Sequence, residues 1–175
     1  PPPHQRKAAP AVQVDNTAAF DRVRWDFLQE VMEAMGFPEE FRAFIGEIYT
    51  DLQFAIRVNG QKGGKGDVTN GVRQGCPASP LIFIIVQEAL LMAIRGDEQL
   101  KGIKVVTGGG GEETEVRERC MADDTVVYLE SAAQAGRLFQ IIGEFEEASG
   151  QLLNPSKSTG ILFGDEKLKE LPKGT

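Results

Sequence analysis

Residues 116–129 read VRERCMADDTVVYL, and this stretch decides the fold. Apolar residues on both sides of Ala122-Asp123-Asp124 predict two strands, 116–121 and 125–129, joined by a tight turn. Two adjacent acids between apolar strands are unusual, because buried like charges repel each other. A divalent cation relieves that repulsion, and Mg²⁺ prefers carboxylate oxygens. Taken alone, an exposed Asp-Asp turn without a metal is the simpler interpretation, since Asp favours turns.

Another acid stands at the end of a second predicted strand. Residues 11–15 alternate between apolar and polar side chains, and the strand ends at Asp15. An acid after a strand is often only a loop residue. Combined with Asp123 and Asp124, however, Asp15 would supply the third carboxylate of a two-metal site. Such sites hold their ions about 3.5–4 Å apart and stabilise both the attacking and the leaving oxygen in phosphoryl transfer.

Residues 71–80 read GVRQGCPASP and form the third candidate element. Glycines and prolines at this density fix an unusual backbone path. Arg73 and Gln74 could then reach a phosphate or a base. The alternative is a structured loop before a helix. A metal site at Cys76 is disfavoured, because His4 and Cys120 offer no suitable ligand spacing.

The rest of the chain mixes helices and strands without regular alternation. Three helices are predicted by their ends: one capped by Asp21 and ended by Gly36, one opening at Pro38, and one running from Ser131, which forms a capping box with Gln134, to Gly150. A helix from Ser79-Pro80 to Arg95 is apolar nearly all round, which places it deep in the core. The remaining expected segments are a strand at 54–58 with a hairpin turn at Asn59-Gly60 and a weak return arm near 67–69, a strand at 102–106, a glycine-rich acidic loop at 108–115, and a strand at 159–163. This order predicts an α+β fold with helices packed on one face of a sheet.

Length and composition fit one globular domain. The chain has 175 residues, 41% hydrophobic and 26% charged, which suffices for a sizeable core. We expect a disordered lead-in at 1–11, one domain at 12–164 and a tail at 165–175. Two cysteines cannot build a disulfide framework, which favours an intracellular location. The apolar run 81–94 is too short and too polar for a membrane span, and the N-terminus does not have the pattern of a signal peptide.

The formal net charge of -7 has the wrong sign for a nucleic-acid enzyme, because phosphate binding is driven by Lys and Arg. The distribution of charge matters more than the total, and carboxylates that hold metal add to the negative count.

Four segments together resemble the reverse transcriptases of non-LTR, LINE-type retrotransposons. They are DNTAAFDRV at 15–23, RQGCPASP at 73–80, MADD at 121–124 and SGQLLNPSKS at 149–158. The resemblance runs in the family's order and spacing from about Val12 to Gly164. The sequence departs from the family's pattern at Ala18, usually Lys, at Ala78, usually Leu, and at Met121, usually aromatic. None of these positions is a metal ligand in the family.

The resemblance implies a right-hand polymerase palm, an antiparallel sheet with helices on one face, with fingers and thumb largely missing. It implies that Asp15, Asp123 and Asp124 hold two Mg²⁺ ions, with Mn²⁺ as a possible substitute, and that the Asn16 carbonyl adds a ligand. It further implies that Phe20 is a steric gate against a ribose 2′-hydroxyl. The nucleotide and template would be lined by Arg73, Gln74 and Gly75. Lys157 would protonate the leaving pyrophosphate.

The activity implied by the resemblance is RNA-directed DNA synthesis, with an RNA template, a DNA primer and deoxynucleoside triphosphates as partners, no membrane, and a nuclear location. Two alternatives stay open. One is a catalytically inactive retrotransposon remnant that serves as a structural or interaction domain, and the other is a maturase of the group II intron type. Trp25 and the Asn59-Gly60 segment fit the LINE pattern better than the maturase pattern.

Overall fold

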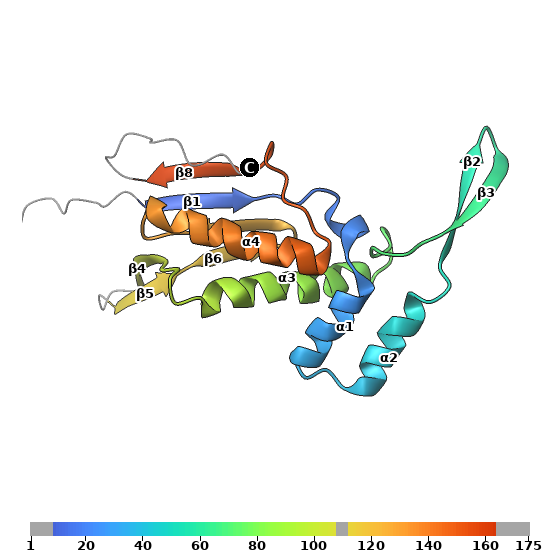
Figure 1. Ribbon diagram of the computed structural model, residues 1–175, viewed down its shortest axis with the longest axis horizontal. Helices are drawn as coiled ribbons and strands as arrows, with labels where there is room; N and C mark the ends of the chain where they lie inside the picture. The colour runs from blue at the N-terminus through green and yellow to red at the C-terminus, as the bar shows by residue number, and fades with distance from the viewer. Residues whose placement is uncertain (1–8, 108–111, 164–175) are drawn as a thin grey trace, which may run out of the picture.

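The computed structural model describes residues 9–107 and 112–163, and a four-stranded antiparallel sheet forms the centre of this part (Figure 1). The strands lie in the order β6-β7-β1-β8, so the first strand of the chain is central. The elements in chain order are β1 (Ala9–Val14), the 3₁₀ helix η1 (Ala19–Arg22), α1 (Trp25–Ala34), α2 (Glu39–Ile48), β2 (Gln53–Val58), β3 (Gln61–Asp67), α3 (Ser79–Gly96), β4 (Ile103–Thr107), β5 (Glu112–Val116), β6 (Glu118–Met121), β7 (Asp124–Tyr128), the 3₁₀ helix η2 (Ala132–Gln134), α4 (Ala135–Ser149) and β8 (Thr159–Phe163).

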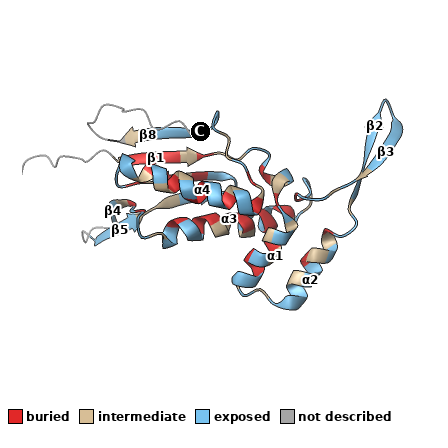
Figure 2. Ribbon diagram, viewed as in Figure 1, coloured by how far each residue is buried: buried red, intermediate tan, exposed pale blue. Residues whose placement is uncertain are grey.

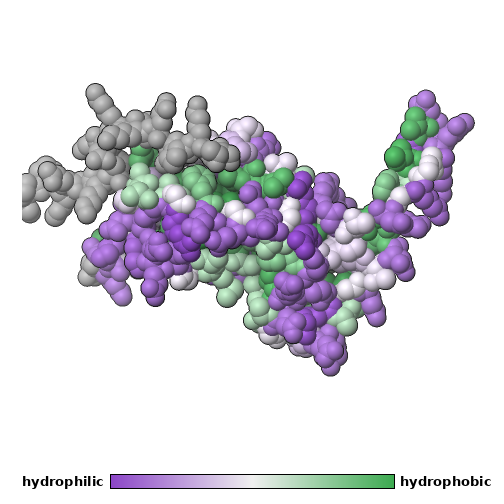
Figure 3. Space-filling model, viewed as in Figure 1, coloured by the Kyte–Doolittle hydropathy of each residue, from purple (hydrophilic) through white to green (hydrophobic). Residues whose placement is uncertain are grey.

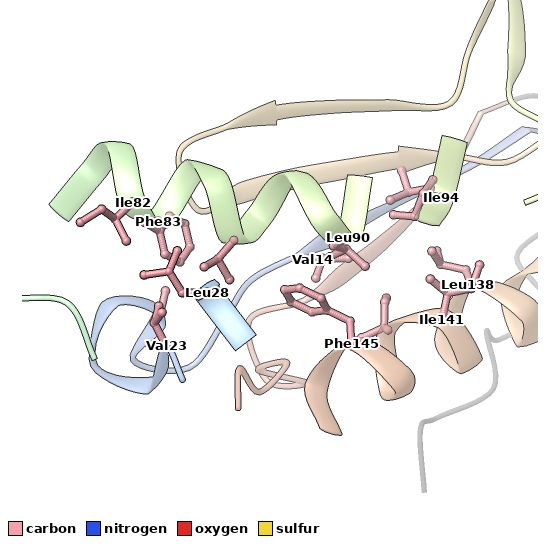
Figure 4. Packing of buried hydrophobic residues seen from close by; sticks show 14 of the residues in the cluster. Val14, Val23, Leu28, Ile82, Phe83, Leu90, Ile94, Leu138, Ile141 and Phe145 are labelled. Atoms are coloured by element: carbon pink, nitrogen blue, oxygen red, sulfur yellow. The ribbon is translucent and has the colours of Figure 1, made fainter. Parts of the chain in front are cut away.

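One hydrophobic core lies between the sheet and the helices α1, α3 and α4 (Figures 2 and 4). Val12 and Val14 of β1 and Val127 of β7 point into it, while the residues between them are less buried or lie on the other face. Side chains alternate between the two faces of a strand, so one face of the sheet is covered by helices. The expected α+β architecture with helices on one face is confirmed.

Helix α3 supplies much of this core, including Phe83, Leu90 and Ile94 (Figure 4). Contrary to the expectation of complete burial, Leu81 is 66% exposed and Met92 is 54% exposed. The helix therefore has one face in the core and one apolar face outside it. Among the described helices, α3 alone is long and apolar enough to cross a membrane, yet its buried side belongs to the core, as in the central helix of a folded domain.

Several helix and strand ends differ from the sequence prediction. Asp21 does not cap α1: it lies inside η1, and α1 begins at Trp25. Ser79 is the first residue of α3, and its hydroxyl donates to the Arg73 carbonyl at 2.6 Å instead of capping the helix. The capping box of Ser131 and Gln134 is present, as predicted. The two corrected positions share a cause, because their polar groups bond to neighbouring segments.

The strands also differ in extent. β1 begins at Ala9, within the expected lead-in, because residues 9–13 pair with β8. The return arm of the first hairpin is Gln61–Asp67, directly after the Asn59-Gly60 turn, and not the weak segment near 67–69. Part of the expected loop at 108–115 is strand β5, paired with β4. Residues 1–8, 108–111 and 164–175 lie outside the described residues, so the expected tail and most of the lead-in do as well.

An ion pair ties the segment after α3 to α4. The Asp97 carboxylate accepts bonds from the Gln99 and Leu100 backbone amides, and Arg137 donates to it from Nε at 2.8 Å. The Arg137 guanidinium lowers the pKa of Asp97 below its usual value, with smaller contributions from the two amides.

Replacing Arg137 should therefore change how stability depends on pH. A lowered pKa in the folded state stabilises the fold above the unfolded-state pKa of about 3.9, and this contribution is lost as the pH falls through the folded-state value. We expect Arg137→Gln to have a smaller free energy of unfolding at pH 6 than the wild type, and a smaller further loss below about pH 4. Urea denaturation at several pH values measures both. The control is Arg119→Gln, because Arg119 is exposed and makes no ion pair with a described residue. If the free energy of unfolding falls equally below about pH 4 in the wild type and in Arg137→Gln, the expectation is wrong.

Candidate active site

The Asp-Asp segment forms the turn between β6 and β7. Met121 pairs with Asp124, so the turn itself consists of Ala122 and Asp123. Ala122 has φ 57°, in the left-handed region that costs a residue with a Cβ about 1–2 kcal/mol. Both aspartates are exposed. The strained turn thus carries two acids at the exposed end of a hairpin whose strand β7 packs on the core through Thr125 and Val127.

The strand register brings Asp15 next to this turn. Val14 of β1 pairs with Thr125 of β7, so the next residue along β1, Asp15, adjoins Asp124. Val14 and Thr125 are both buried on the helix side of the sheet. Because neighbouring residues in a strand point to opposite faces, Asp15 and Asp124 lie on the face that the helices leave open.

The three aspartates share a location but do not form a closed metal cage. Among the described residues, no three Asp, Glu, His or Cys side chains gather into a group that could hold a metal ion. Like-charged carboxylates repel each other, and they converge only around a cation. The donor set itself fits a hard divalent ion, since carboxylate oxygens from two adjacent strands are what Mg²⁺ takes. The backbone therefore places the candidate ligands, and side-chain rotation would have to complete the site.

Polar side chains connect the Asp-Asp turn to the core, from the buried Gln87 and Thr125 to the exposed Cys120. Gln87 of α3, which is 1% exposed, donates from Nε2 to the Thr125 hydroxyl at 3.0 Å. The Thr125 hydroxyl donates to Cys120 Sγ at 3.4 Å, and Cys120 Sγ donates to the Ala122 carbonyl at 3.4 Å. This relay runs from the core helix to the strained residue of the Asp-Asp turn. The roles of Gln87 and Thr125 were not predicted from the sequence, although a glutamine in an apolar helix is a signal for a buried hydrogen bond.

The segment 152–158 holds Asp15 from the other side. The Asp15 amide donates to Ser158 Oγ at 3.2 Å, and its carbonyl accepts from the Asn154 amide at 2.7 Å. Lys157 is exposed and is adjacent to Ser158 in the chain. The backbone of the lysine segment is thereby fixed beside the first aspartate, with Lys157 in the turn.

Asn16 pairs with Leu153 in an isolated antiparallel bridge. The bonds flanking it are made by Asp15 and Thr17, so the amide and carbonyl of Asn16 itself point away from this segment, toward the side of β1 on which β7 lies. A carbonyl on that side faces the Asp-Asp hairpin, which is the orientation that an added ligand would need.

Phe20 is the second residue of η1. This helix begins directly after Ala18, which is left-handed with φ 49°. Its ring is half-buried and stacks on Phe83 of α3, with centroids 4.9 Å apart and an interplanar angle of 22°. The ring is therefore anchored to the core on one side. Because it is only partly covered, both sequence interpretations of Phe20, as a core residue and as a gate, are compatible with its position.

The segment 71–75 lies directly on η1. The Val72 amide donates to the Phe20 carbonyl and the Gly71 amide to the Val23 carbonyl, both at 2.7 Å. Gly71 has φ +89°, and a Cβ there would lie 2.7 Å from the Asp21 carbonyl oxygen, so only glycine fits. Trp25 Nε1 donates to the Gly71 carbonyl at 2.8 Å.

Gln74 and Arg73 border a shallow pocket of about 360 Å³ beside η1, which Asp21, Asn70 and Val72 also line. Gln74 Nε2 donates to both carboxylate oxygens of Asp21, at 3.1 and 3.3 Å. The Arg73 side chain is exposed, and Gly75 has φ +87°. The structure thus gathers the predicted site residues in two adjoining groups, the acids with the lysine segment and Phe20 with the 73–75 loop.

A second buried glutamine joins these groups. Gln151 is 0% exposed, and its Nε2 donates to the Ala19 carbonyl at 2.9 Å. It connects the start of the lysine segment to the residue before Phe20. Its role was not predicted either, because its neighbours in sequence gave no apolar periodicity to mark it as buried.

An antiparallel sheet with helices on one face and acids from two adjacent central strands at the other is the palm of a right-hand polymerase. Solved structures support this class at the level of the fold. The telomerase of Candida tropicalis, in complex with a fragment of telomeric RNA, matches 89% of the chain with a TM-score of 0.65 and 10% identity, and the chain covers 26% of it. The corresponding structure from Candida albicans gives a TM-score of 0.53 with 11% identity, over 92% of the chain and 27% of that protein.

The family model for reverse transcriptase (RNA-dependent DNA polymerase) matches residues 3–171, so the chain belongs to this family. Among similar proteins are an uncharacterized 149 kDa protein of transposon TX1 from Xenopus laevis, 27% identical over 92% of the chain, and a retrovirus-related Pol polyprotein of the R2 retrotransposable element from Popillia japonica, 26% identical over 93% of it. The chain spans 12% and 26% of the length of these two relatives. The predicted resemblance to non-LTR retrotransposon reverse transcriptases is confirmed.

The buried hydrogen bond between Gln87 and Thr125 gives a prediction on stability. Thr125→Val should lower the free energy of unfolding by about 1–3 kcal/mol, because it leaves the buried Gln87 amide without its acceptor. Thr125→Ser keeps the hydroxyl and should retain the hydrogen bond, losing only the contribution of one methyl group, about 1 kcal/mol. Urea denaturation of both variants measures the difference. If Thr125→Val is as stable as the wild type, the relay does not stabilise the hairpin.

Proposed function

We propose that this chain is the catalytic palm of an RNA-directed DNA polymerase, which joins deoxynucleoside triphosphates to a primer 3′-hydroxyl along an RNA template with two Mg²⁺ ions. The register of β1 against β7 is the observation that carries the proposal, because it brings Asp15 to Asp124 on the open face of the sheet. Membership of the reverse transcriptase family gives the reaction class.

In this proposal Asp15, Asp123 and Asp124 hold the metal ions, and the Asn16 carbonyl adds an oxygen from the side that faces β7. When bound, the ions would activate the primer hydroxyl and neutralise charge on the triphosphate. The primer 3′-hydroxyl gives its proton to solvent, the new bond forms between its oxygen and the α-phosphorus, and the bond from that phosphorus to the pyrophosphate oxygen breaks. Lys157 supplies a proton to the leaving pyrophosphate.

The second group of residues selects the substrate. The Phe20 ring, held by its stack on Phe83, would lie under the sugar and exclude a 2′-hydroxyl by steric overlap. Arg73, Gln74 and Gly75 would line the nucleotide and template, at the pocket beside η1. The bonds from Val72 to Phe20 and from Gln74 to Asp21 keep these two segments in a fixed relation.

The alternative function is a non-catalytic remnant that acts as an interaction domain. The departures at Ala18, Ala78 and Met121 favour it, as does the lack of a closed three-acid cluster among the described residues. The two functions differ in one property of the chain, since only the catalytic palm needs the three aspartates to bind divalent metal together.

Metal binding therefore separates the two functions. We expect Mn²⁺ to bind the chain and to raise its Tm, since a ligand that binds only the folded state stabilises it. Asp123→Asn should weaken Mn²⁺ affinity by about 10- to 100-fold, on the scale of the loss seen when metal sites lose supporting groups. Calorimetric titration measures the affinity, and thermal unfolding gives the shift in Tm.

Asp51→Asn is the matched control, because Asp51 is also an exposed acid in a turn but lies outside the site. Equal Mn²⁺ affinity in the wild type, Asp123→Asn and Asp51→Asn would favour the non-catalytic function. Primer extension in a longer polypeptide that contains this palm provides the second readout, where Asp123→Asn should abolish synthesis.

The role of Phe20 has its own test. In a polypeptide active in primer extension, Phe20→Val should raise the incorporation of ribonucleotides relative to deoxynucleotides by about 10- to 200-fold, the usual range for one misfitting group in a pocket. Phe27→Val removes a similarly half-buried ring, which contacts Phe145 in the core, and controls for general loosening. If both variants leave the ratio of the two substrates unchanged, Phe20 is a core residue.

A further inference from the structure

Strands β2 and β3 form an arm, defined here as residues 53–67, that projects from the body of the protein (Figure 1). The two strands pair only with each other and belong to neither of the other sheets. All their residues are exposed except Gly66, which is half-buried (Figure 2). The arm contributes nothing to the core, so its side chains are not explained by packing.

The register sorts these side chains by chemistry. Arg57 pairs with Lys62, and Ala55 pairs with Lys65, across a bulge opposite Ile56. Paired residues share a face, and residues two apart in a strand do as well. Arg57, Lys62 and Lys65 therefore lie on one face of the arm, which we call the basic face.

The opposite face is apolar, with Phe54, Ile56 and Val58 between 49% and 64% exposed. Figure 3 shows apolar and polar surface side by side on the arm. The Phe54 ring lies over its cross-strand partner Gly66, where a Cβ would come within 2.5 Å of the ring. The pairing thus places the three cations on one face of the arm and the three large apolar side chains on the other, where Gln61 pairs with Val58.

The basic face is unfavourable for folding by itself. Like charges directly opposite each other in a strand pair destabilise it, and Arg57 and Lys62 are such a pair. Within the described part of the chain, no acid forms an ion pair with Arg57, Lys62 or Lys65. Asp67, on the same face, instead bonds to Gln53 at the base of the arm. A polyanion would remove the repulsion that the fold leaves in place.

We propose that the basic face of the arm binds the sugar–phosphate backbone of the nucleic acid that the palm copies. Charge complementarity carries this, because three unpaired cations gather on one strand face in a chain whose net charge is -7. Phe54, the aromatic residue of the arm, lies on the opposite face, so the basic face offers charge to phosphates but no ring on which a base could stack. The inference rests on the proposed function for the identity of the polyanion.

The test compares two matched double variants of the full chain. Lys62→Gln/Lys65→Gln neutralises the basic face, and Lys101→Gln/Lys104→Gln removes the same charge at exposed positions around β4. Fluorescence anisotropy gives the Kd of an RNA–DNA primer–template in EDTA, at salt concentrations from about 50 to 200 mM. Each lost phosphate contact lowers the slope of log K against log salt by about 0.7–0.9, so the arm variant should lose about 1.5. At about 50 mM salt this corresponds to roughly 10- to 100-fold weaker binding.

Three results would overturn the inference: equal slopes for the two double variants, no binding of the primer–template by the wild-type chain at low salt, or displacement of the primer–template by poly-glutamate at equal charge concentration. The last would make the arm a surface for acidic proteins. Binding in EDTA does not depend on metal or on catalysis. The two proposals can therefore fail separately. If the arm variant lowers the salt slope as expected but the chain does not bind Mn²⁺, the proposed activity is wrong and the arm is still a nucleic-acid contact.

Discussion

The candidate site depends on one constraint, the pairing of Val14 with Thr125 between β1 and β7. Both residues are buried against the helices, so the register is fixed by the core. A shift by one residue would turn the strand over and bring Asp15 toward the hydrophobic side. The burial of two small side chains thus determines where the acids of two distant segments meet.

Polar contacts inside the fold then fix what the strand register leaves free. Gln87 reaches the Asp-Asp turn through Thr125 and Cys120, and Gln151 reaches the segment before Phe20. A buried amide that loses its partner carries the full desolvation penalty, so each of these bonds resists displacement of the segment it holds. Gly71 also fixes a site segment, but by its small size: because it has no side chain, the 71–75 loop can lie directly on η1. The site segments are loops and turns, yet each is attached to a core element.

The sequence predicted most of this framework, because strand pairs and helix ends have local signals. Alternation identified β1, apolar residues beside the Asp-Asp turn identified β7, β8 was also predicted as a strand, and the capping box identified the helix after Ser131. Errors arose where a polar group bonds at long range: Asp21 accepts from Gln74, which is 53 residues away, instead of capping α1. Strands β3 and β5 were missed or misplaced because glycines and acids mark loops in isolation, whereas here a hairpin partner supplies the pairing. The residues suggested Asp15 as a third carboxylate beside Asp123 and Asp124, but only the order of motifs in the resemblance supported that grouping, because no local pattern encodes which strands become neighbours.

The acidity of the chain is easier to reconcile with a nucleic-acid substrate when charge is considered by element. α2 begins with Glu39 and Glu40, where acids stabilise the positive end of the helix. Many other acids are engaged within the fold, such as Asp97 with Arg137 and Glu88 with Arg95. Charges paired in this way project little field beyond about one Debye length, roughly 8–10 Å. The cations of the arm have no such partners in the described structure. Their positive field therefore attracts anions although the net charge of the chain is negative. The sign of the total charge is therefore a poor guide to what one exposed element of this protein attracts.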